Sequence, residues 1–387
     1  MSVVLSASVR QNLLSLQSTA ELLATTQNRL STGKKVNTAL DNPTNFFTAQ
    51  GLDNRANDIS NLLDGIGNGV QVLQAANTGI TSLQKLVDTA KSIANQVLQA
   101  PTGYAPKSTV SSAAALGGTS ANLVDNVTIK ATDVLDIAAT GGGTATHIVF
   151  GASESLAQLN ATLAANNLTA SLDNANKLVI TTTNDAASST IGAVTYTNTG
   201  GGTASFGAVA PPVADVASQT IRSNLVSQYN NVITQITTTA QDASFNGINL
   251  LNGDDLKLIF NETGKSTLNI PGVTYSATGL GLTTLVAGTN FLDNNSANAV
   301  IAKLSTASDA LRTEASSLGS NLSIVQIRQD FSKNLINVLQ TGSSNLTLAD
   351  TNEEAANSQA LSTRQSIAVS ALALANQSQA SVLQLLR

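Results

Sequence analysis

Apolar residues recur every seven positions in two long segments of the chain, about 44–100 and 297–346. A seven-residue apolar repeat predicts α-helices that pack along a coiled-coil seam. The second series is interrupted once, at Ser332. The first series consists of Leu52, Ile59, Ile66, Leu73, Ile80 and Val87, joined by Ala56, Leu63 and Val70; the second consists of Leu304, Leu311, Leu318, Val325, Leu339 and Leu346, joined by Ala315, Leu322 and Ile336.

Both ends of the chain carry a similar but weaker pattern. The first segment is followed by "STGKKVNTALDNP", in which Gly33 and Pro43 predict a loop, and the last begins at "ADTNEEAAN", in which Asp350 is the expected helix N-cap. The predicted seam residues are Val9, Leu13, Leu16, Leu23 and Leu30, with Ala20 and Gln27 between them, in the first helix, and Leu361, Ala368, Leu372, Ala375, Val382 and Leu386 in the last.

The middle of the chain, 104–215, has a different pattern, with short β-prone runs separated by Gly, Ser and Thr. "SESLAQLNATLA" predicts one short helix that starts with a capping box of Ser155 and Gln158. "LTASLDNANKLVITT" predicts a hairpin around its Asn/Asp turn. Helical periodicity returns over about 216–242, and two short strands are expected after it.

The sequence therefore predicts a mainly α protein whose paired N- and C-terminal long helices form a coiled-coil rod, with one inserted α+β outer domain. The expected parts are terminal helices at 1–42 and 347–387, a helical rod at 43–101 and 216–346 with a β-hairpin near 245–285, and a surface-exposed outer domain at 102–215.

Composition narrows the classes of function. Charged residues make up 11% of the chain and aromatic residues 3%, which disfavours a deep aromatic ligand pocket. The net charge is −5 and no basic cluster occurs, so we expect no nucleic-acid partner. The chain has no Cys, which excludes disulfides and thiolate chemistry. We expect no cofactor and no metal.

Charge is scarcest at the two ends. The first 32 residues hold only Arg10, Glu21 and Arg29, and no charged residue occurs between Gln365 and Leu386. Gln, Asn and Ser make these helices too polar to insert into a membrane. A helix without a charged face must be surrounded. We therefore predict that both terminal helices pack against other copies of the chain, and that they become ordered as the copies assemble.

Few residues suggest chemistry. His147 is the only histidine, which excludes a zinc site of the HExxH type and favours a structural role. Asp254 and Asp255 follow Asn252-Gly253 in a predicted turn and need no catalytic role. Gly65, Gly67 and Gly69 lie inside a heptad helix and predict a close approach of a neighbouring backbone, or a bend. We expect no enzymatic activity.

Five stretches together resemble bacterial flagellin, the filament subunit: "RLSTGKKVNTALDNP", "ASFNGINLLNG", "TGLGLTTL", "ADTNEEAANSQAL" and "ANQSQASVLQLLR". The resemblance covers about 1–100 and 216–387. It implies a structural subunit that is exported unfolded through the flagellar export apparatus, with an export chaperone, and polymerises under a filament cap into an extracellular filament for swimming. The start of the chain lacks a basic region and a long apolar core, so no cleaved signal peptide is expected.

The sequence departs from the flagellin pattern in two places. The extra domain is inserted at 102–215, before the helix at 216–242 rather than after the hairpin. In enteric-type flagellins an innate immune receptor binds a run late in the first long helix, which "DTAKSIANQ" replaces here. Thr89, Lys91, Ser92 and Ile93 form the equivalent site, and it is degenerate because Thr89 and Ser92 replace charged residues. We expect this filament to escape that receptor.

Two alternatives remain from the sequence. A hook–filament junction protein shares terminal helices of this kind but assembles in few copies. A surface adhesin would act through residues 104–215.

Overall fold

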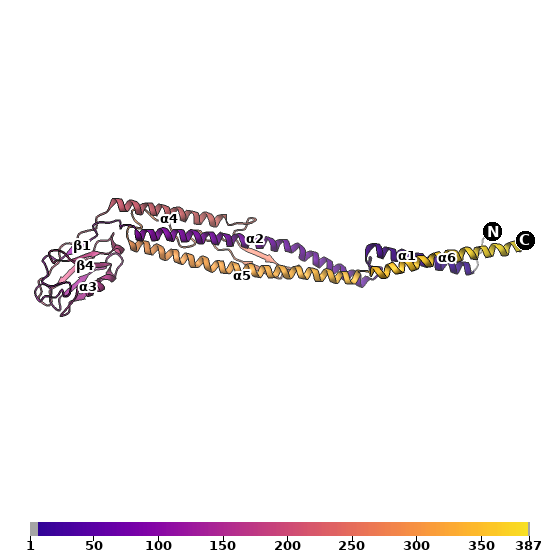
Figure 1. The fold of residues 1–387 in the computed structure, drawn as a ribbon, viewed down its shortest axis with the longest axis horizontal. Helices are drawn as coiled ribbons and strands as arrows, with labels where there is room; N and C mark the ends of the chain where they lie inside the picture. The colour runs from indigo at the N-terminus through magenta and orange to yellow at the C-terminus, as the bar shows by residue number, and fades with distance from the viewer. Residues whose placement is uncertain (1–6, 386–387) are drawn as a thin grey trace. The chain divides into compact units, whose positions relative to one another are not determined.

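The computed structural model describes residues 7–385, apart from the side chains of Gln379 and of 382–385. The chain divides into two compact units: Met1–Gly69, Lys257–Leu268 and Ile324–Arg387 form the first, and Val70–Leu256 and Asn269–Ser323 form the second. Two long helices, α2 (Pro43–Gln99) and α5 (Asn294–Thr347), contribute residues to both units (Figure 1). Both match the heptad segments of the sequence within a few residues.

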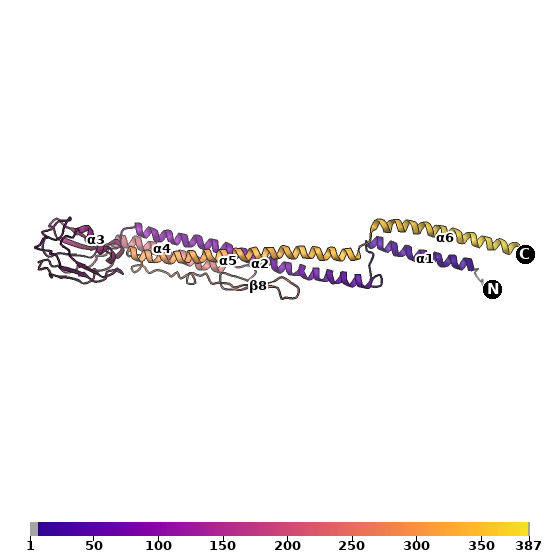
Figure 2. The ribbon, with the colours of Figure 1, turned by 90° about the horizontal axis from the view of Figure 1, so that it is seen from below.

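The first unit contains the two terminal helices, α1 (Ala7–Thr32) and α6 (Thr351–Leu385), which lie side by side in both views (Figures 1 and 2). Asp350 Oδ1 accepts hydrogen bonds from the backbone N–H groups of Asn352 (2.9 Å) and Glu353 (3.3 Å). This confirms Asp350 as the N-cap of α6, where a carboxylate satisfies N–H groups that have no partner inside the helix.

Within the first unit α2 and α5 pack through small and branched residues. Ala56 and Ile59 of α2 form a buried cluster with Leu339 of α5. Ser332, which interrupts the sequence repeat, is 2% exposed and so stays on the buried face of α5. The heptad pattern correctly identified this face.

A two-stranded hairpin, β7 (Leu256–Ile259) and β8 (Thr267–Ile270), is present where the sequence predicts one. In the first unit, Arg55 Nε of α2 lies 2.8 Å from Glu262 Oε1 in the turn of the hairpin. The guanidinium of Arg328 on α5 lies 5.4 Å from the ring centre of Phe260. These contacts attach the hairpin to both long helices.

In the second unit α4 (Val216–Asp242) joins the bundle. Leu73, Ile80 and Val87 of α2 are completely buried, as are Leu304 and Leu311 of α5. The core includes residues outside the seam as well, because α4 covers a further face of the bundle; these are Val72, Leu83 and Ala94 of α2, and Tyr229, Ile233 and Ile236 of α4.

The surroundings of the glycines in α2 differ from those that the sequence suggested. At Gly65 an added Cβ would meet nothing within 4 Å, and at Gly69 it would lie 2.4 Å from Leu258 Cδ2. The expected backbone approach is therefore wrong: at Gly69 a hairpin side chain fills the space. The helix α2 continues through these three glycines without a break. Gly79, which the sequence did not single out, is also crowded: an added Cβ would lie 2.7 Å from the methyl of Ala243 and 2.6 Å from Leu251 Cδ1.

The region between α2 and α4 contains two three-stranded antiparallel sheets and one helix. The helix begins at the predicted capping box, in which Ser155 and Gln158 each bond the other's backbone N–H. The predicted hairpin is also confirmed. The first sheet orders β1 (Thr109–Ser111), β5 (Leu178–Thr182) and β4 (Leu168–Leu172); the second orders β3 (Thr146–Val149), β2 (Val134–Ile137) and β6 (Val194–Thr197); the helix is α3 (Leu156–Leu163).

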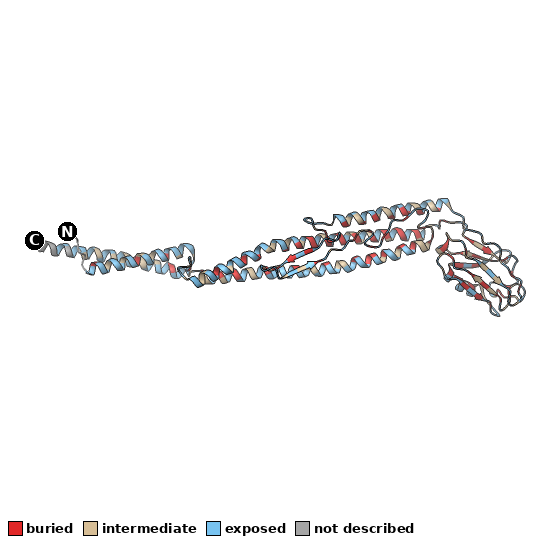
Figure 3. Ribbon diagram, turned by 180° about the vertical axis from the view of Figure 1, so that it is seen from behind, coloured by how far each residue is buried: buried red, intermediate tan, exposed pale blue. Residues whose placement is uncertain are grey.

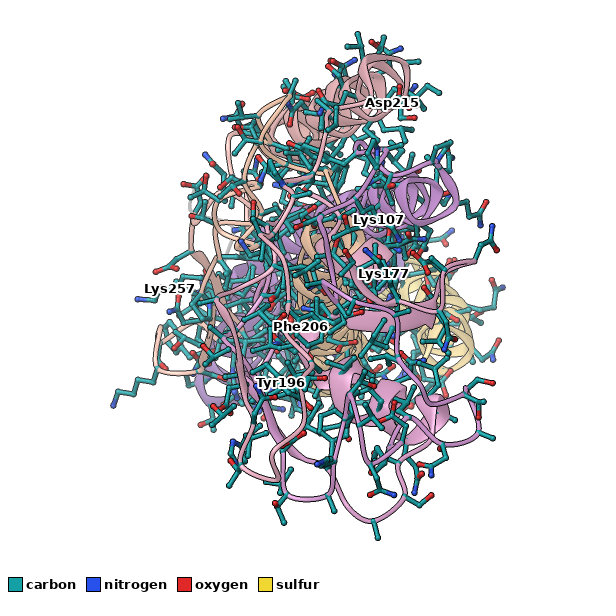
Figure 4. The ribbon with its side chains drawn as sticks, turned by 90° about the vertical axis from the view of Figure 1, so that its left-hand side faces the viewer. Lys107, Lys177, Tyr196, Phe206, Asp215 and Lys257 are labelled. Atoms are coloured by element: carbon teal, nitrogen blue, oxygen red, sulfur yellow. The ribbon has the colours of Figure 1, made fainter. Side chains whose placement is uncertain are left out.

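This region has a core of its own. Leu123, Leu135, Leu159 and Leu178 are among its completely buried residues. The ring of Tyr196 packs between those of Phe150 and Phe206, with centroids 6.2 and 5.9 Å away. Figure 4 shows Tyr196 and Phe206 beside each other in this region. A separate aliphatic core is what allows a segment to fold as a unit inserted between helices.

A buried arginine joins the helices at the point where the inserted region begins. Arg222 of α4 is 1% exposed and donates only to backbone carbonyls. Its Nε bonds Pro101 O at 2.6 Å, its Nη1 bonds Phe291 O at 2.7 Å, and its Nη2 bonds Val97 O and Ala100 O at 3.1 Å. Arg222 thus satisfies carbonyls at the C-terminus of α2, where they lack partners within the helix.

Candidate assembly surface

Backbone hydrogen bonds hold the end of α1 beside the start of α6. Lys35 N–H donates to Thr347 O at 2.7 Å, and Ala349 N–H donates to Gly33 O at 3.0 Å. Gly33 takes the left-handed conformation, with φ +68°, that ends a helix in this way. Because the chain turns here on both sides, α1 and α6 run antiparallel.

One ion pair reinforces this junction. Arg29 Nη1 lies 3.2 Å from Glu354 Oε1, and the side chain of Glu354 is only 11% exposed. The pair neutralises one charge of each terminal helix. Its carboxylate also lies in the first turn of α6, where the helix dipole favours negative charge.

The contact face of α1 is displaced from the predicted seam. Val9, Thr19 and Thr26 are its buried residues, whereas the predicted Gln27 is exposed and Ala20 half-buried. Val9, Leu16 and Leu23 keep one predicted series of the seam, whereas the other series moves by one residue, from Ala20 and Gln27 to Thr19 and Thr26. Two threonines in the contact also show that this face is narrow and only weakly apolar.

The predicted assembly residues are largely uncovered within one chain. Leu13 and Leu30 are exposed at 37% and 40%, and only Val9 is buried. Leu386 and the side chain of Val382 lie outside the described residues. The others are half-buried: Leu16, Leu23, Leu361, Ala368, Leu372 and Ala375. Their part in contacts between copies stays a prediction.

Further apolar side chains, which the sequence reasoning did not select, project from the same helices. Leu14, Leu22, Ile367, Val369 and Leu374 are 66%, 52%, 63%, 52% and 69% exposed. Figure 3 shows α1 and α6 coloured mainly as exposed or intermediate. The sequence could have identified these five residues, because they are apolar, lie outside the predicted seam and belong to helices that lack a charged face. Side chains of this size at such exposure are typical of a surface that another molecule covers.

A groove of about 530 Å³ lies between α1 and α6. Leu22 and Ile367 supply apolar surface, and Arg364 supplies the only charge among its lining residues. The remaining lining residues are small or polar: Asn12, Ser15, Ser18, Thr19 and Ala368. Small side chains let another helix approach closely.

The second predicted site, late in α2, is partly buried. Ile93 is 6% exposed, and Lys91 Nζ donates to Ser305 Oγ of α5 at 3.1 Å. Thr89 and Ser92 are exposed, and the Thr89 hydroxyl donates to the backbone carbonyl of Lys85. Thr89 and Ser92, the two positions where charge was expected and is missing, are therefore the ones that face solvent.

The residues that could suggest catalysis serve turns and strand pairing. Asp254 Oδ2 accepts the N–H of Asn249 at 2.8 Å, and Asp255 Oδ1 accepts that of Gly272 at 3.1 Å. His147 pairs with Asp136 directly opposite on the neighbouring strand, with Nδ1 and Oδ1 2.5 Å apart. The predicted structural role of these residues agrees with these contacts.

Residues 7–385 contain neither a cluster of metal ligands nor a membrane-spanning helix. Nowhere in that range do three His, Asp or Glu side chains converge as metal ligands would. None of the helices in that range is both long and apolar enough to cross a membrane.

Comparison with known proteins gives consistent matches at both ends of the chain. The bacterial flagellin N-terminal helical region matches residues 5–132 and the bacterial flagellin C-terminal helical region matches 301–386, together more than half of the chain. Flagellin FljM of Caulobacter vibrioides is 34% identical over 165 residues, which are 42% of this chain and 59% of that protein.

Other flagellins match this chain with similar identity and coverage. Flagellin FljK of Caulobacter vibrioides is 34% identical over the same shares of both chains, and the flagellin of Brucella melitensis is 28% identical over 44% of this chain and 64% of its own. This chain thus spans about three-fifths of the length of these relatives. The matched regions contain all of α1, α2 and α6 and most of α5, so by both its helices and its sequence the chain belongs to the bacterial flagellin family.

Proposed function

We propose that this chain is the structural subunit of a bacterial flagellar filament, outside the cell, and serves swimming motility. The observation that carries the proposal is the uncovered apolar surface of α1 and α6, on helices with almost no charge. The names of the matched relatives, all flagellins, favour a filament subunit over a junction protein or an adhesin.

Burial of that surface supplies the driving force for assembly. Leu14, Ile367 and Leu374 are each more than 60% exposed. Complete burial of one such side chain contributes about 1.5–3 kcal/mol. The five exposed residues therefore offer several kcal/mol per copy, which a single chain leaves unused. Contacts between this surface and a different surface of the next copy are heterologous, and heterologous contacts that do not close into a ring extend a helical array.

The partners of such a subunit follow from the family. We propose export of the unfolded chain through the flagellar export apparatus, with an export chaperone, and addition under a filament cap. The contacts between copies involve Val9, Leu13, Leu16, Leu23 and Leu30 of α1, together with the seam residues of α6. The inserted region 102–215 would then be an outer domain, displayed on the filament surface.

Seeded polymerisation tests the proposal. Full-length chain is compared with a variant that lacks 1–32 and 355–387, by negative-stain microscopy and circular dichroism. We expect only the full-length chain to lengthen the seeds and to gain helix as it does so. The variant keeps α2, α4 and α5, so its own helical signal is the control for folding. Equal polymerisation of the shortened variant would reject the proposal.

We further propose that the filament protein escapes the innate receptor that binds the family's α2 run. The support is that Thr89 and Ser92, which replace charged residues, are exposed, while Ile93 is buried. A reporter-cell assay with purified monomer measures this. We expect no activation at doses at which an enteric-type flagellin is fully active, and full activation would contradict the proposal.

A further inference from the structure

The charges of the two terminal helices are few enough to account for individually. Among the described residues, α1 carries three charges and α6 carries three. Arg29 and Glu354 pair with each other. Glu353 lies in the first turn of α6, where the helix dipole stabilises it. This leaves Arg10, Glu21 and Arg364.

Glu21 and Arg364 are both exposed, and within residues 7–385 neither forms an ion pair. Arg364 lines the groove between α1 and α6, next to the exposed Leu22 and Ile367. Two apolar side chains and one cation, in a groove otherwise lined by small and polar residues, fit a helix that presents an apolar residue and an anion on one face.

The outer face of α1 has that composition. Leu14 and Glu21 are seven residues apart, so they lie on one side of the helix, and both are exposed. Leu14 is 66% exposed. The described part of α1 and α6 offers no other unpaired carboxylate beyond the first turn of α6.

We propose that the groove between α1 and α6 receives α1 of a second copy of this chain, with the Glu21 carboxylate of one copy paired to the Arg364 guanidinium of the next. Leu14 of the entering helix then packs against Leu22 and Ile367. The inference rests on the proposed function and names the contact through which neighbouring copies recognise each other.

Electrostatics gives the reason for pairing across copies. A charge that loses its water without a partner costs several kcal/mol, so a polymer that covers these helices must compensate both residues. Their signs are opposite, and each copy brings one of each. The pair therefore repeats along the array and compensates both of these charges in every copy, and it disfavours a shifted register in which like charges would meet.

The first experiment reverses each charge. E21R and R364E are compared with wild-type chain in seeded elongation at low salt, where ion pairs are least screened. Arg and Glu both favour helix, so circular dichroism should show unchanged monomers. We expect each variant alone to elongate at least about tenfold more slowly than wild type, because like charges meet at the contact.

The second experiment mixes the two variants. In an equimolar mixture of E21R and R364E every contact between unlike copies regains opposite charges, and we expect elongation within about twofold of wild type. An attraction within one chain could not be restored by mixing. The double variant E21R/R10E is the matched control, because it returns the net charge to the wild-type value while position 21 still carries the same sign as Arg364 at every contact, and it should not recover elongation.

The outcomes separate the two levels of the proposal. Three outcomes would each overturn the Glu21–Arg364 contact: normal elongation by both single variants, failure of the E21R and R364E mixture to elongate, or equal rescue of E21R by the R10E substitution. In each case normal elongation by the wild-type chain would leave the filament proposal intact. Failure of the wild-type chain itself to elongate would reject the filament proposal and this contact with it.

Discussion

At the scale of single residues, Arg222 shows how one side chain replaces several missing hydrogen bonds. Its guanidinium contacts four carbonyls from two separate stretches of chain, 97–101 and Phe291, and it is almost completely buried. Only arginine has enough donors in a fixed plane to reach all four. The sequence shows a lone Arg in an amphipathic helix and does not distinguish it from a surface residue.

We expect Arg222→Met to lower the free energy of unfolding of the second unit by about 3 kcal/mol or more, because several buried carbonyls lose their donor. Arg312→Met is the matched control: the Arg312 side chain is 72% exposed, and its 3.6 Å contact with Asp309 lies on the surface. The control should change stability by less than about 0.5 kcal/mol. Calorimetry of the monomers compares the two, and equal effects would contradict the role given to Arg222.

Asp125 makes a comparable set of contacts in the inserted region. Its Oδ1 accepts three backbone N–H groups, those of Val127, Thr128 and Ile129, and its Oδ2 accepts the Thr128 hydroxyl. Burial by itself would raise the pKa of Asp125, but these hydrogen bonds outweigh it and lower the pKa from 3.8 to about 2. The folded state therefore holds the carboxylate more strongly than the unfolded chain does.

This predicts a pH dependence with a definite sign. A lowered pKa in the folded state stabilises the fold above the unfolded pKa, near pH 4, and this stabilisation is lost as the pH falls toward 2. We expect Asp125→Ala to be less stable than wild type at neutral pH, with the difference narrowing between pH 4 and pH 2. Asp125→Asn keeps an acceptor oxygen and should lose less. Thermal unfolding across this pH range would show it; a constant difference would contradict the assignment.

At the scale of elements, the helix breaks, the capping box at Ser155, the N-cap Asp350 and the hairpin of β4 and β5 were all predictable. Each depends on residues close in sequence. The shift of the contact on α1 from Ala20 and Gln27 to Thr19 and Thr26 was not predictable, because it depends on how α6 is rotated against α1. The contacts that require glycine at positions 69 and 79 of α2 could not be predicted from the sequence either, because their partners, Leu258 and Ala243, are distant in sequence.

Two glycines of α2 give opposite predictions for one substitution. Gly79→Ala places a methyl 2.7 Å from that of Ala243, which cannot rotate away, so we expect a loss of about 1–3 kcal/mol. Gly65→Ala meets nothing within 4 Å and should stabilise the helix by about 1 kcal/mol. Urea unfolding of the two monomers, followed by circular dichroism, measures both. The same sign for both would show that packing does not decide the outcome.

At the scale of the whole molecule, the inserted region leaves the helices and returns to them at one place. Asp215 N–H donates to Gly103 O at 3.0 Å, and Ala105 N–H donates to Val213 O at 2.9 Å. Two side-chain contacts link the region to the start of α5: Ser188 Oγ to Asp293 Oδ2 at 2.5 Å and Asn295 Nδ2 to Gly141 O at 3.1 Å. With its own core and adjacent ends, the region meets the physical conditions for removal.

We therefore expect a chain in which a Gly-Gly turn replaces 105–213 to keep its helical bundle and to polymerise. The reason is that α1 and α6 are unchanged and that only two side-chain links to α5 are lost. Circular dichroism and seeded elongation measure folding and assembly, and the isolated segment 102–215 is tested alongside for a cooperative transition of its own. Loss of the bundle on excision would show that the region is part of the rod's core.

The sequence by itself determined which segments are helical and where the chain breaks, and it predicted that the ends pack against other copies. These conclusions depend on local periodicity, turn residues and the absence of charge, all of which are properties of short stretches. Only the tertiary structure decided which side chains of α1 and α6 stay uncovered, that Arg222 joins distant carbonyls, and that Glu21 and Arg364 remain unpaired within the described chain. These depend on how helices from opposite ends of the sequence are rotated against each other, and packing between distant residues sets that rotation.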